Sequence, residues 1–487
     1  MLARLRAAGP AAWVPALGAW LVTGYRLAVQ VLRDARTFTV DDPRFSTARV
    51  VGPSMLSLDG EPHARHRGPF NRAFRHDEVH ARLASFTRAE AGRLVSAIRP
   101  LGEAELRRAV AGPLAVAVMA ETLGLGQADP AQVLAWYDGI VAAVQAAAAA
   151  QAAGDGAHDP AGAGPAGTAF AALAASLREV ITTQPLSLLA EVTGPLTQTE
   201  AISNAAVLMF GGIETTEGMI ANALLHLLSS PAQLGLVLAD RALVPAAVEE
   251  SLRLEPAAAV VDRYATRDAQ LGGARIRAGD QVTVSIAAAN RDPAVFGEPD
   301  AFDVRRPDAG RHLAFAHGPH FCLGAHLARL EAQVAIGTIL DLLPRLRLDP
   351  RHPGAPRGLV FRKPPGLRAC WDRLRPLRVL RLLTPGTGHK SMRGRLGDRM
   401  NIVRITASPE VLRGLYDIAG LELVTSGEAG PEGGLPTVSG YATDEAVSRV
   451  RARGARVDVL LDAETRLARL RRVAAEARRS RSSGRGA

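Results

Sequence analysis

The apolar pattern that begins after Thr197 and continues to about Leu228 constrains the fold more than any other part of this sequence. Thr197 and Glu200 have the spacing of a capping box, which predicts that a helix begins there. At about 1.5 Å per residue, such a helix can cross an entire domain. A second long helix is predicted after Cys322, and the residues expected along one side of it are Leu327, Leu330, Val334 and Leu342.

Length and composition indicate one large helical domain with a smaller appendage. The chain has 487 residues, of which 47% are hydrophobic and only 4% aromatic, and this favours an Ala/Leu-rich helical protein over a β-sandwich or a disordered chain. Cys322 and Cys370 are its two cysteines, so we expect no disulfide framework and a cytoplasmic location. The apolar stretch Ala11–Leu32 is interrupted by Pro15 and Arg26. It therefore predicts a packed segment with strand-like pieces, and no membrane anchor.

The sequence predicts four parts: a large domain over residues 1–383, a basic glycine-containing linker over 384–399, a small α+β domain over 400–465 and a basic tail over 466–487. Within the large domain, Gly154–Gly167 has the composition of a loop that could cover a pocket. The small domain follows a β-α-β-β-α-β order, which is typical of a ferredoxin-like sandwich. Its expected elements are strand 401–406, helix 409–419, strand 421–425, strand 435–441, helix 444–453 and strand 456–461.

The net charge of +10 is concentrated near the C-terminal end. Residues 362–399 contain eleven Lys or Arg and two Asp, and seven arginines follow between 469 and 485. Contact with nucleic acid or anionic lipid is one interpretation of this charge. A solvated linker and tail is the interpretation that we favour, because no aromatic or glycine-rich pattern accompanies the basic residues.

The strongest chemical signal is the run Phe315-Ala-His-Gly-Pro-His-Phe-Cys-Leu-Gly324. Cys322 comes just before the second long helix, whose free N–H groups and positive end would favour a thiolate over a thiol. Gly318 and Gly324 would let the backbone approach a flat ligand closely. A zinc site is the alternative, because His317, His320 and His326 lie near Cys322. The spacing of these residues and the single thiol make zinc the weaker interpretation.

The first long helix carries Gly211 and Gly212 near its midpoint, followed by Glu214 and Thr215. Each glycine weakens a helix by about 1 kcal/mol relative to alanine, so a pair of glycines needs a reason. An ionisable side chain in an apolar helix needs one too. A local opening that holds a small ligand beside an acid and a hydroxyl would account for both features, and a kinked helix with a solvated Glu214 is the alternative.

The run around Cys322 resembles the haem-binding loop of the cytochrome P450 family, and Ala325–Glu331 resembles the helix that follows this loop in bacterial members. Ala316 departs from the pattern, because the family usually has glycine there. The resemblance covers about residues 10–375. It implies a mainly α fold, a helical triangular prism with small β-sheets, that holds haem b with Cys322 as the axial ligand of the iron and Phe315, Gly318 and Gly324 beside it.

The same resemblance assigns roles to residues far from the cysteine. Glu250 and Arg253 match the family's E-x-x-R pair, and Arg306 matches the third member of that structural network. His63, Arg67, Arg263 and His320 match the residues that bind the haem propionates, where cations would offset the buried carboxylates. Glu214 and Thr215 match the acid and threonine that relay protons to dioxygen.

The resemblance implies a haem-thiolate monooxygenase that inserts one atom of dioxygen into an organic small molecule, of secondary-metabolite or xenobiotic type. Because the sequence contains no flavin or reductase fingerprint, we expect electrons from a separate ferredoxin and ferredoxin reductase. The alternative is a haem protein that acts mainly as a binding or recruitment module through its C-terminal domain.

Overall fold

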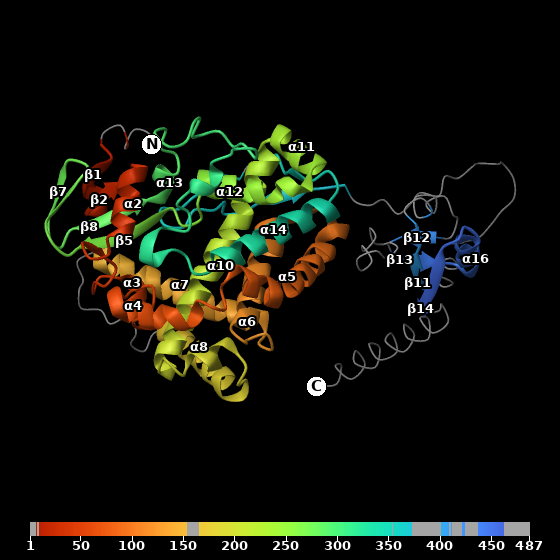
Figure 1. The fold of residues 1–487 in the computed structure, drawn as a ribbon, viewed down its shortest axis with the longest axis horizontal. Helices are drawn as coiled ribbons and strands as arrows, with labels where there is room; N and C mark the ends of the chain where they lie inside the picture. The colour runs from red at the N-terminus through yellow and green to blue at the C-terminus, as the bar shows by residue number, and fades with distance from the viewer. Residues whose placement is uncertain are drawn as a thin grey trace, which may run out of the picture. The chain divides into compact units, whose positions relative to one another are not determined.

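The helix predicted after Thr197 is α10 (Gln198–Ser229), the longest helix in the described part of the chain. The Glu200 amide donates to Thr197 Oγ1 at 3.3 Å, and the Thr197 amide donates to Glu200 Oε2 at 2.9 Å. These two bonds confirm the predicted capping box. In Figure 1, α10 runs through the middle of the helical region, and it packs against α6, α12 and α14.

This computed structural model describes residues 6, 9–152, 165–352, 354–372, 401–408, 411, 421–423 and 437–461. The chain divides into two units, Met1–Leu377 and Arg378–Ala487. The predicted linker and tail lie outside the described residues, as does most of the predicted loop at 154–167, whose last residues begin α8.

No single described helix is long and apolar enough to cross a membrane. The pair formed by α10 and α11 passes the same criterion together, but the two helices meet at a bend of 104°.

The first unit is rich in helices, and the largest group of buried apolar side chains lies where they meet. Helix α14 buries Leu327 and Leu330 as predicted, whereas Val334 and Leu342 are only partly buried. Its buried face continues through other residues, among them Ile336 and Ile339. Besides α10, the helices are α2 (Tyr25–Arg33), α3 (Ser46–Val51), α4 (Gly60–Arg67), α5 (His76–Ile98), α6 (Gly112–Thr122), α7 (Pro130–Ala152), α8 (Pro165–Thr183), α9 (Leu188–Val192), α11 (Pro231–Ala239), α12 (Val244–Leu254), α13 (Ile286–Ala289) and α14 (Ala325–Leu342).

Small sheets complete the first unit. A five-stranded sheet has the order β1-β2-β8-β5-β3, in which only the β2–β8 pair is parallel. Because β1 and β2 belong to the apolar N-terminal stretch, the predicted strand-like pieces are confirmed. A three-stranded antiparallel sheet, β4-β10-β9, and a β6–β7 pair lie elsewhere in this unit. The strands are β1 (Ala11–Val14), β2 (Ala19–Val22), β3 (Phe38–Thr39), β4 (Glu103–Glu105), β5 (Val260–Ala265), β6 (Ala269–Leu271), β7 (Ala274–Ile276), β8 (Gln281–Ser285), β9 (Arg347–Leu348) and β10 (Arg368–Cys370).

The second unit contains an antiparallel sheet of order β12-β13-β11-β14 and the helix α16. Val403, Ala446, Val450 and Val457 are among the residues of its own small core. The strand positions agree with the predicted order, but the predicted helix at 409–419 lies outside the described residues except for residue 411. The ferredoxin-like sandwich therefore stays a prediction. The described elements are β11 (Asn401–Thr406), β12 (Leu421–Leu423), β13 (Thr437–Ala442), α16 (Asp444–Ala452) and β14 (Arg456–Leu461).

Candidate active site

Residues 315–324 form a loop, here called the cysteine loop, that leads into α14. The Cys322 amide donates to the Phe315 carbonyl at 2.8 Å and closes this loop. Gly318 has φ +73°, and a Cβ at this position would lie 2.5 Å from the Leu32 carbonyl oxygen. Gly318 is therefore needed for a left-handed turn that packs against the end of α2. The sequence motif did not indicate this packing reason, and contact of Gly318 with a flat ligand stays a prediction.

A cavity of about 1250 Å³ lies beside the cysteine loop and the middle of α10. Ligand pockets usually measure about 300–1,000 Å³, so this one has room for more than a single small molecule. Most predicted site residues line it: Arg67, Glu214, Thr215, Arg263, Phe315, His320, Cys322 and Gly324. The predicted residues that do not line it are His63, Gly318, Glu250, Arg253 and Arg306.

Cys322 exposes its side chain, and the surface that it exposes borders this cavity. The protein packed around the rest of the side chain raises the pKa of the thiol, and this outweighs the Gly324 amide and the Arg67 and Arg329 cations, which lower it. The predicted effect of the helix start is present in the Gly324 amide, but burial of the side chain has the larger effect on the pKa of the thiol. A bound metal ion deprotonates a coordinating thiol, and this would reverse the preference.

The two neighbouring glycines of α10 have different surroundings. A Cβ at Gly211 would meet no atom within 4 Å, and Gly211 lines the cavity. A Cβ at Gly212 would lie 2.1 Å from Met119 Cε, so Gly212 allows close packing against α6. The Thr215 hydroxyl donates to the Gly211 carbonyl at 2.6 Å, within the same turn. Gly211, Gly212 and Thr215 all line the cavity, and Gly212 also allows close packing against α6.

Glu214 is held by residues that sequence reasoning missed. Its Oε2 accepts a hydrogen bond from the Tyr137 hydroxyl, and its Oε1 lies 2.8 Å from Lys363 Nζ. Burial and the nearby Glu214 carboxylate raise the pKa of Tyr137, so this phenol keeps its proton and acts as a donor. Because Tyr137 is 77 residues from Glu214 in the sequence, nothing local in the sequence indicates the contact.

Cationic and histidine side chains gather at one part of the site. Arg263 is buried, and within the described residues it has no carboxylate in ion-pair distance; its NH1 donates to the Asp262 carbonyl at 2.7 Å. His63 and His320 have ring centroids 4.4 Å apart, and the buried His63 Nε2 has no hydrogen-bond partner. These groups fit the carboxylates of a haem, because an anion would pair the guanidinium and accept from the imidazole.

Asp59 is a further residue of this region that the sequence did not indicate. His320 Nε2 lies 2.8 Å from Asp59 Oδ1. Burial alone would raise the pKa of Asp59, but hydrogen bonds from His320, Thr39 and Val40 lower it to about 2. The ionised carboxylate thus orients the His320 ring, as second-sphere carboxylates do for other ligand-binding imidazoles.

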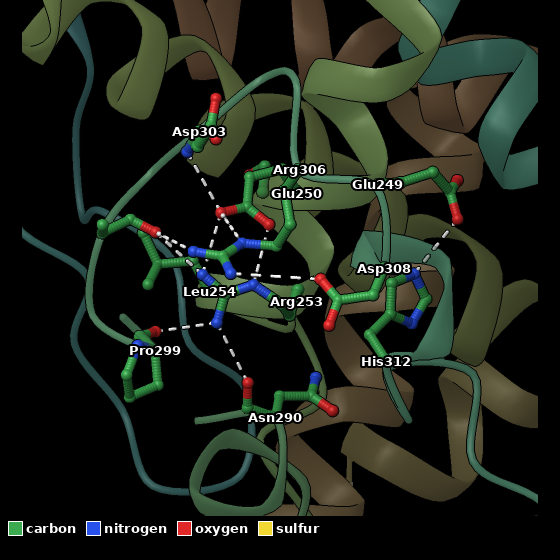
Figure 2. Close-up of polar contacts among 12 residues, drawn as sticks. Glu249, Glu250, Arg253, Leu254, Asn290, Pro299, Asp303, Arg306, Asp308 and His312 are labelled. Atoms are coloured by element: carbon green, nitrogen blue, oxygen red, sulfur yellow. Dashed lines mark hydrogen bonds and ion pairs between the residues drawn. The ribbon is translucent and has the colours of Figure 1, made fainter. Parts of the chain in front are cut away.

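Glu250, Arg253 and Arg306 form one buried network, shown in Figure 2. Glu250 Oε2 accepts from Arg253 Nε at 2.7 Å, and Oε1 accepts from Arg306 Nε at 3.0 Å. Arg253 also donates to the carbonyls of Asn290, Pro299 and Ala301. The sequence predicted this trio, and the structure brings its members together.

The neighbouring Glu249 was missed by sequence reasoning, and it points away from this trio toward His312 (Figure 2). Glu249 accepts two hydrogen bonds from Arg329 of α14, at 2.7 and 2.8 Å, and lies 3.2 Å from His312 Nε2. It therefore links α12 to α14.

The structure gives one finding on the zinc alternative. Within the described residues, no three His, Cys, Asp or Glu side chains lie together in a group that could hold a metal ion.

The sequence matches the family described as cytochrome P450 over residues 237–357. It is 36% identical over 370 residues to the cytochrome P450 monooxygenase PikC of Streptomyces venezuelae, an alignment that covers 71% of this chain and 84% of the relative. It is 33% identical over 363 residues to cytochrome P450 107B1 of Saccharopolyspora erythraea, covering 69% and 84%.

Solved structures show the same fold. The tirandamycin C-bound P450 monooxygenase TamI superposes with a TM-score of 0.64 at 33% identity, covering 76% of this chain and 96% of that one. P450BioI, solved with an acyl carrier protein that carries hexadec-9Z-enoic acid, has a TM-score of 0.68 at 29% identity, covering 76% and 97%. The helix-rich first unit with its small sheets therefore has the cytochrome P450 fold. The chain belongs to the cytochrome P450 family and is an oxidoreductase, a haem-containing monooxygenase.

Proposed function

We propose that Cys322 is the axial thiolate of a haem b bound in the cavity, and that this protein oxidises an apolar small molecule there. The observation that carries the proposal is that Cys322 exposes its side chain to the same cavity that Glu214 and Thr215 line. When bound, the haem iron supplies the reductive activation of dioxygen, and a thiolate ligand favours O–O cleavage. Phe315 and Gly324, which line the cavity, would lie beside the haem.

Arg67, Arg263, His320 and His63 would hold the haem propionates. Arg263 supports this assignment most strongly, because it is a buried cation at the cavity wall without a carboxylate partner among the described residues. Burial lowers its pKa to about 10, so Arg263 stays charged at neutral pH, and a bound anion would stabilise the buried charge. Arg67 donates to the Phe321 carbonyl at 2.7 Å, which keeps its guanidinium next to the cysteine loop.

Glu214 and Thr215 would pass protons from the protein to dioxygen in the cavity. Thr215 lines the cavity one residue after Glu214, and Gly211 leaves open space one turn earlier. The acid can hold a proton on a carboxylate oxygen, and the hydroxyl can both accept and donate one. Glu250, Arg253 and Arg306 lie outside the cavity lining, so we assign them the structural role of holding the polypeptide behind the cysteine loop.

The side chains around the cavity indicate the kind of substrate. Many of them are apolar, among them Val141, Val144, Leu208 and Leu359, so we infer a largely apolar organic molecule of the secondary-metabolite type. Electrons would come from a separate ferredoxin and its reductase. A cytoplasmic location remains a prediction from the low cysteine content, and the second unit has no assigned role.

The test replaces Cys322 with serine and uses Cys370→Ser as the matched control. Cys370 lies in β10, outside the cavity lining. We expect the reduced, carbon monoxide-bound wild type and the Cys370→Ser variant to show the strongly red-shifted Soret band of a haem thiolate. Cys322→Ser should lose this band. An unchanged spectrum in Cys322→Ser would disprove the ligand assignment. Spectra as expected but without any product, in the presence of ferredoxin and reductase, would favour the binding-module alternative.

A further inference from the structure

Lys363 lies between two carboxylates of α10, in a chain that contains almost no lysine. Lys363 and Lys390 are the two lysines of the sequence, and the remaining 56 of its 58 basic residues are arginines. Lys363 Nζ lies 2.8 Å from Glu214 Oε1 and also contacts Glu217 Oε2. A compact ammonium group fits between two carboxylates, whereas a planar guanidinium has a fixed fork geometry.

The carboxylates that Lys363 contacts would repel each other without it. Glu214 and Glu217 are three residues apart on α10, so they lie on the same face of the helix. The side chains of Lys363, Glu214 and Glu217 are 16%, 15% and 13% exposed, so solvent screens them little. On the other side, Arg107 NH1 lies 3.2 Å from Glu217 Oε1, so Glu217 has a second cation, whereas Lys363 is the one cation that pairs with Glu214 among the described residues.

Both oxygens of Glu214 are therefore engaged. Lys363 contacts Oε1, and the Tyr137 hydroxyl of α7 donates to Oε2. Two partners on different elements therefore hold the carboxylate in one orientation. Besides Glu217, Asp138 is an acid near Glu214. Burial together with Glu214 raises the pKa of Asp138, while Lys363 opposes that rise.

The backbone fixes the position of Lys363. The Lys363 segment, residues 357–363, is held against residues 257–259, because the Arg362 amide donates to the Ala257 carbonyl and the Ala259 amide donates to the Val360 carbonyl, both at 2.8 Å. Asn222 of α10 donates to the Arg362 carbonyl at 2.9 Å.

The same segment forms part of the cavity wall. Gly358, Leu359, Val360 and Phe361 line the cavity, immediately before the lysine. The segment that contacts the substrate space therefore also carries the cation that contacts Glu214.

We propose that Lys363 is a positioning residue that holds Glu214 in the orientation from which Glu214 and Thr215 deliver protons. This inference rests on the proton-relay role proposed above for Glu214. Without Lys363, the carboxylate would face Glu217 with only the Tyr137 hydroxyl to hold it. Proton delivery would then limit the rate of oxygen reduction.

The first test does not depend on turnover. Lysine labelled with ¹³Cε and ¹⁵Nζ gives two side-chain signals in the full-length protein, and Lys390→Arg assigns them. In the diamagnetic ferrous carbon monoxide complex, we expect Glu214→Gln to shift the Lys363 signal and leave the Lys390 signal in place. A Lys363 signal that does not respond to Glu214→Gln would overturn the proposed contact.

The second test measures the solvent isotope effect on oxygen consumption, with a surrogate ferredoxin and reductase as electron donors and 7-ethoxycoumarin as the probe in the cavity. We expect Lys363→Met and Glu214→Gln each to raise the isotope effect at least about twofold. Lys363→Arg should restore only part of the wild-type value, because a guanidinium keeps the positive charge but does not fit between the two carboxylates as an ammonium does. Arg362→Met is the matched control, because Arg362 pairs with Glu255 at 2.6 Å and not with Glu214.

The outcomes separate the two proposals. If Glu214→Gln changes the isotope effect and Lys363→Met does not, the role of Lys363 is wrong and the relay stands. If neither variant changes it, the relay assigned to Glu214 has failed and the inference about Lys363 fails with it. The reduced carbon monoxide spectrum of each variant should match the wild type, which excludes loss of the haem site as the cause.

Discussion

At the scale of single residues, the backbone of the cysteine loop determines which side chains it tolerates. Ala316 has φ +58° and Gly318 has φ +73°. A left-handed conformation costs an alanine about 1–2 kcal/mol, and it costs a glycine almost nothing. Ala316 is thus strained at the position where the family usually has glycine, whereas Gly318 is suited to its conformation.

Two substitutions in this loop and one control outside it should have three different effects on stability. Ala316→Gly should stabilise the protein by about 0.5–1 kcal/mol, because relief of strain exceeds the extra entropy of an unfolded glycine. Gly318→Ala should destabilise it by at least about 2 kcal/mol, because strain adds to the contact with the Leu32 carbonyl. Gly310→Ala is the control, because Gly310 is outside the cavity lining, lies outside the left-handed region and has open space around a Cβ. Its effect should stay within about 0.5 kcal/mol.

Urea unfolding of the haem-containing variants gives these differences, provided that the slopes of the transitions agree. The backbone explanation fails if Gly318→Ala is no more destabilising than Gly310→Ala. The sequence located Gly318 by its spacing but did not indicate its packing, because the approach of Leu32 from another part of the chain is not visible in a local motif.

At the scale of elements, the predictions from sequence succeeded where the determinants are local. The start of α10 follows from Thr197 and Glu200, which are three residues apart, and α14 begins three residues after Cys322. The contacts that sequence reasoning missed join distant residues. Asp59 and His320 are 261 residues apart, and Glu249 and Arg329 are 80 apart. A single sequence contains no periodicity that pairs such positions, so these contacts depend on the completed fold.

The pairing of α12 with α14 predicts a contribution to acid sensitivity. Burial alone would raise the pKa of Glu249, but hydrogen bonds from Arg329 and His312 lower it from 4.5 to about 2. Because the folded-state pKa lies below the unfolded value, this group stabilises the protein above about pH 4.5 and loses its effect as the pH falls toward 2. The full contribution is about 3 kcal/mol.

Glu249→Gln should therefore lower the free energy of unfolding at pH 7. Between about pH 5 and pH 2, the variant should lose less of this free energy than the wild type does. Urea unfolding of wild type and variant across this range measures the difference directly. Arg329→Met should weaken the pH dependence of the free energy of unfolding over the same range. The double variant should be only slightly less stable than either single variant, because each of the three variants removes the same interaction. Equal pH slopes in wild type and Glu249→Gln would contradict the assignment.

At the scale of the whole molecule, the two units have separate hydrophobic cores. The large core of the first unit includes residues of α5, α10 and α14, and the second unit buries Val403, Ile405 and Val457 in a core of its own. The cavity and the predicted haem residues belong to the first unit. A protein whose cores are separate can lose one unit without opening the other.

A chain truncated after Leu377, the boundary of the first unit, should therefore fold and bind haem. We expect its reduced carbon monoxide spectrum to match that of the full chain, and its thermal unfolding to show one transition at nearly the same temperature, because the buried side chains around the cavity are unchanged. The removed residues 378–487 carry much of the positive charge of the chain. Any salt-dependent binding of the full chain to DNA or anionic vesicles should therefore be lost in the truncated chain. Loss of haem or a clearly lower transition temperature in the truncated chain would instead show that the second unit stabilises the first, and that the separate cores do not describe how this protein folds.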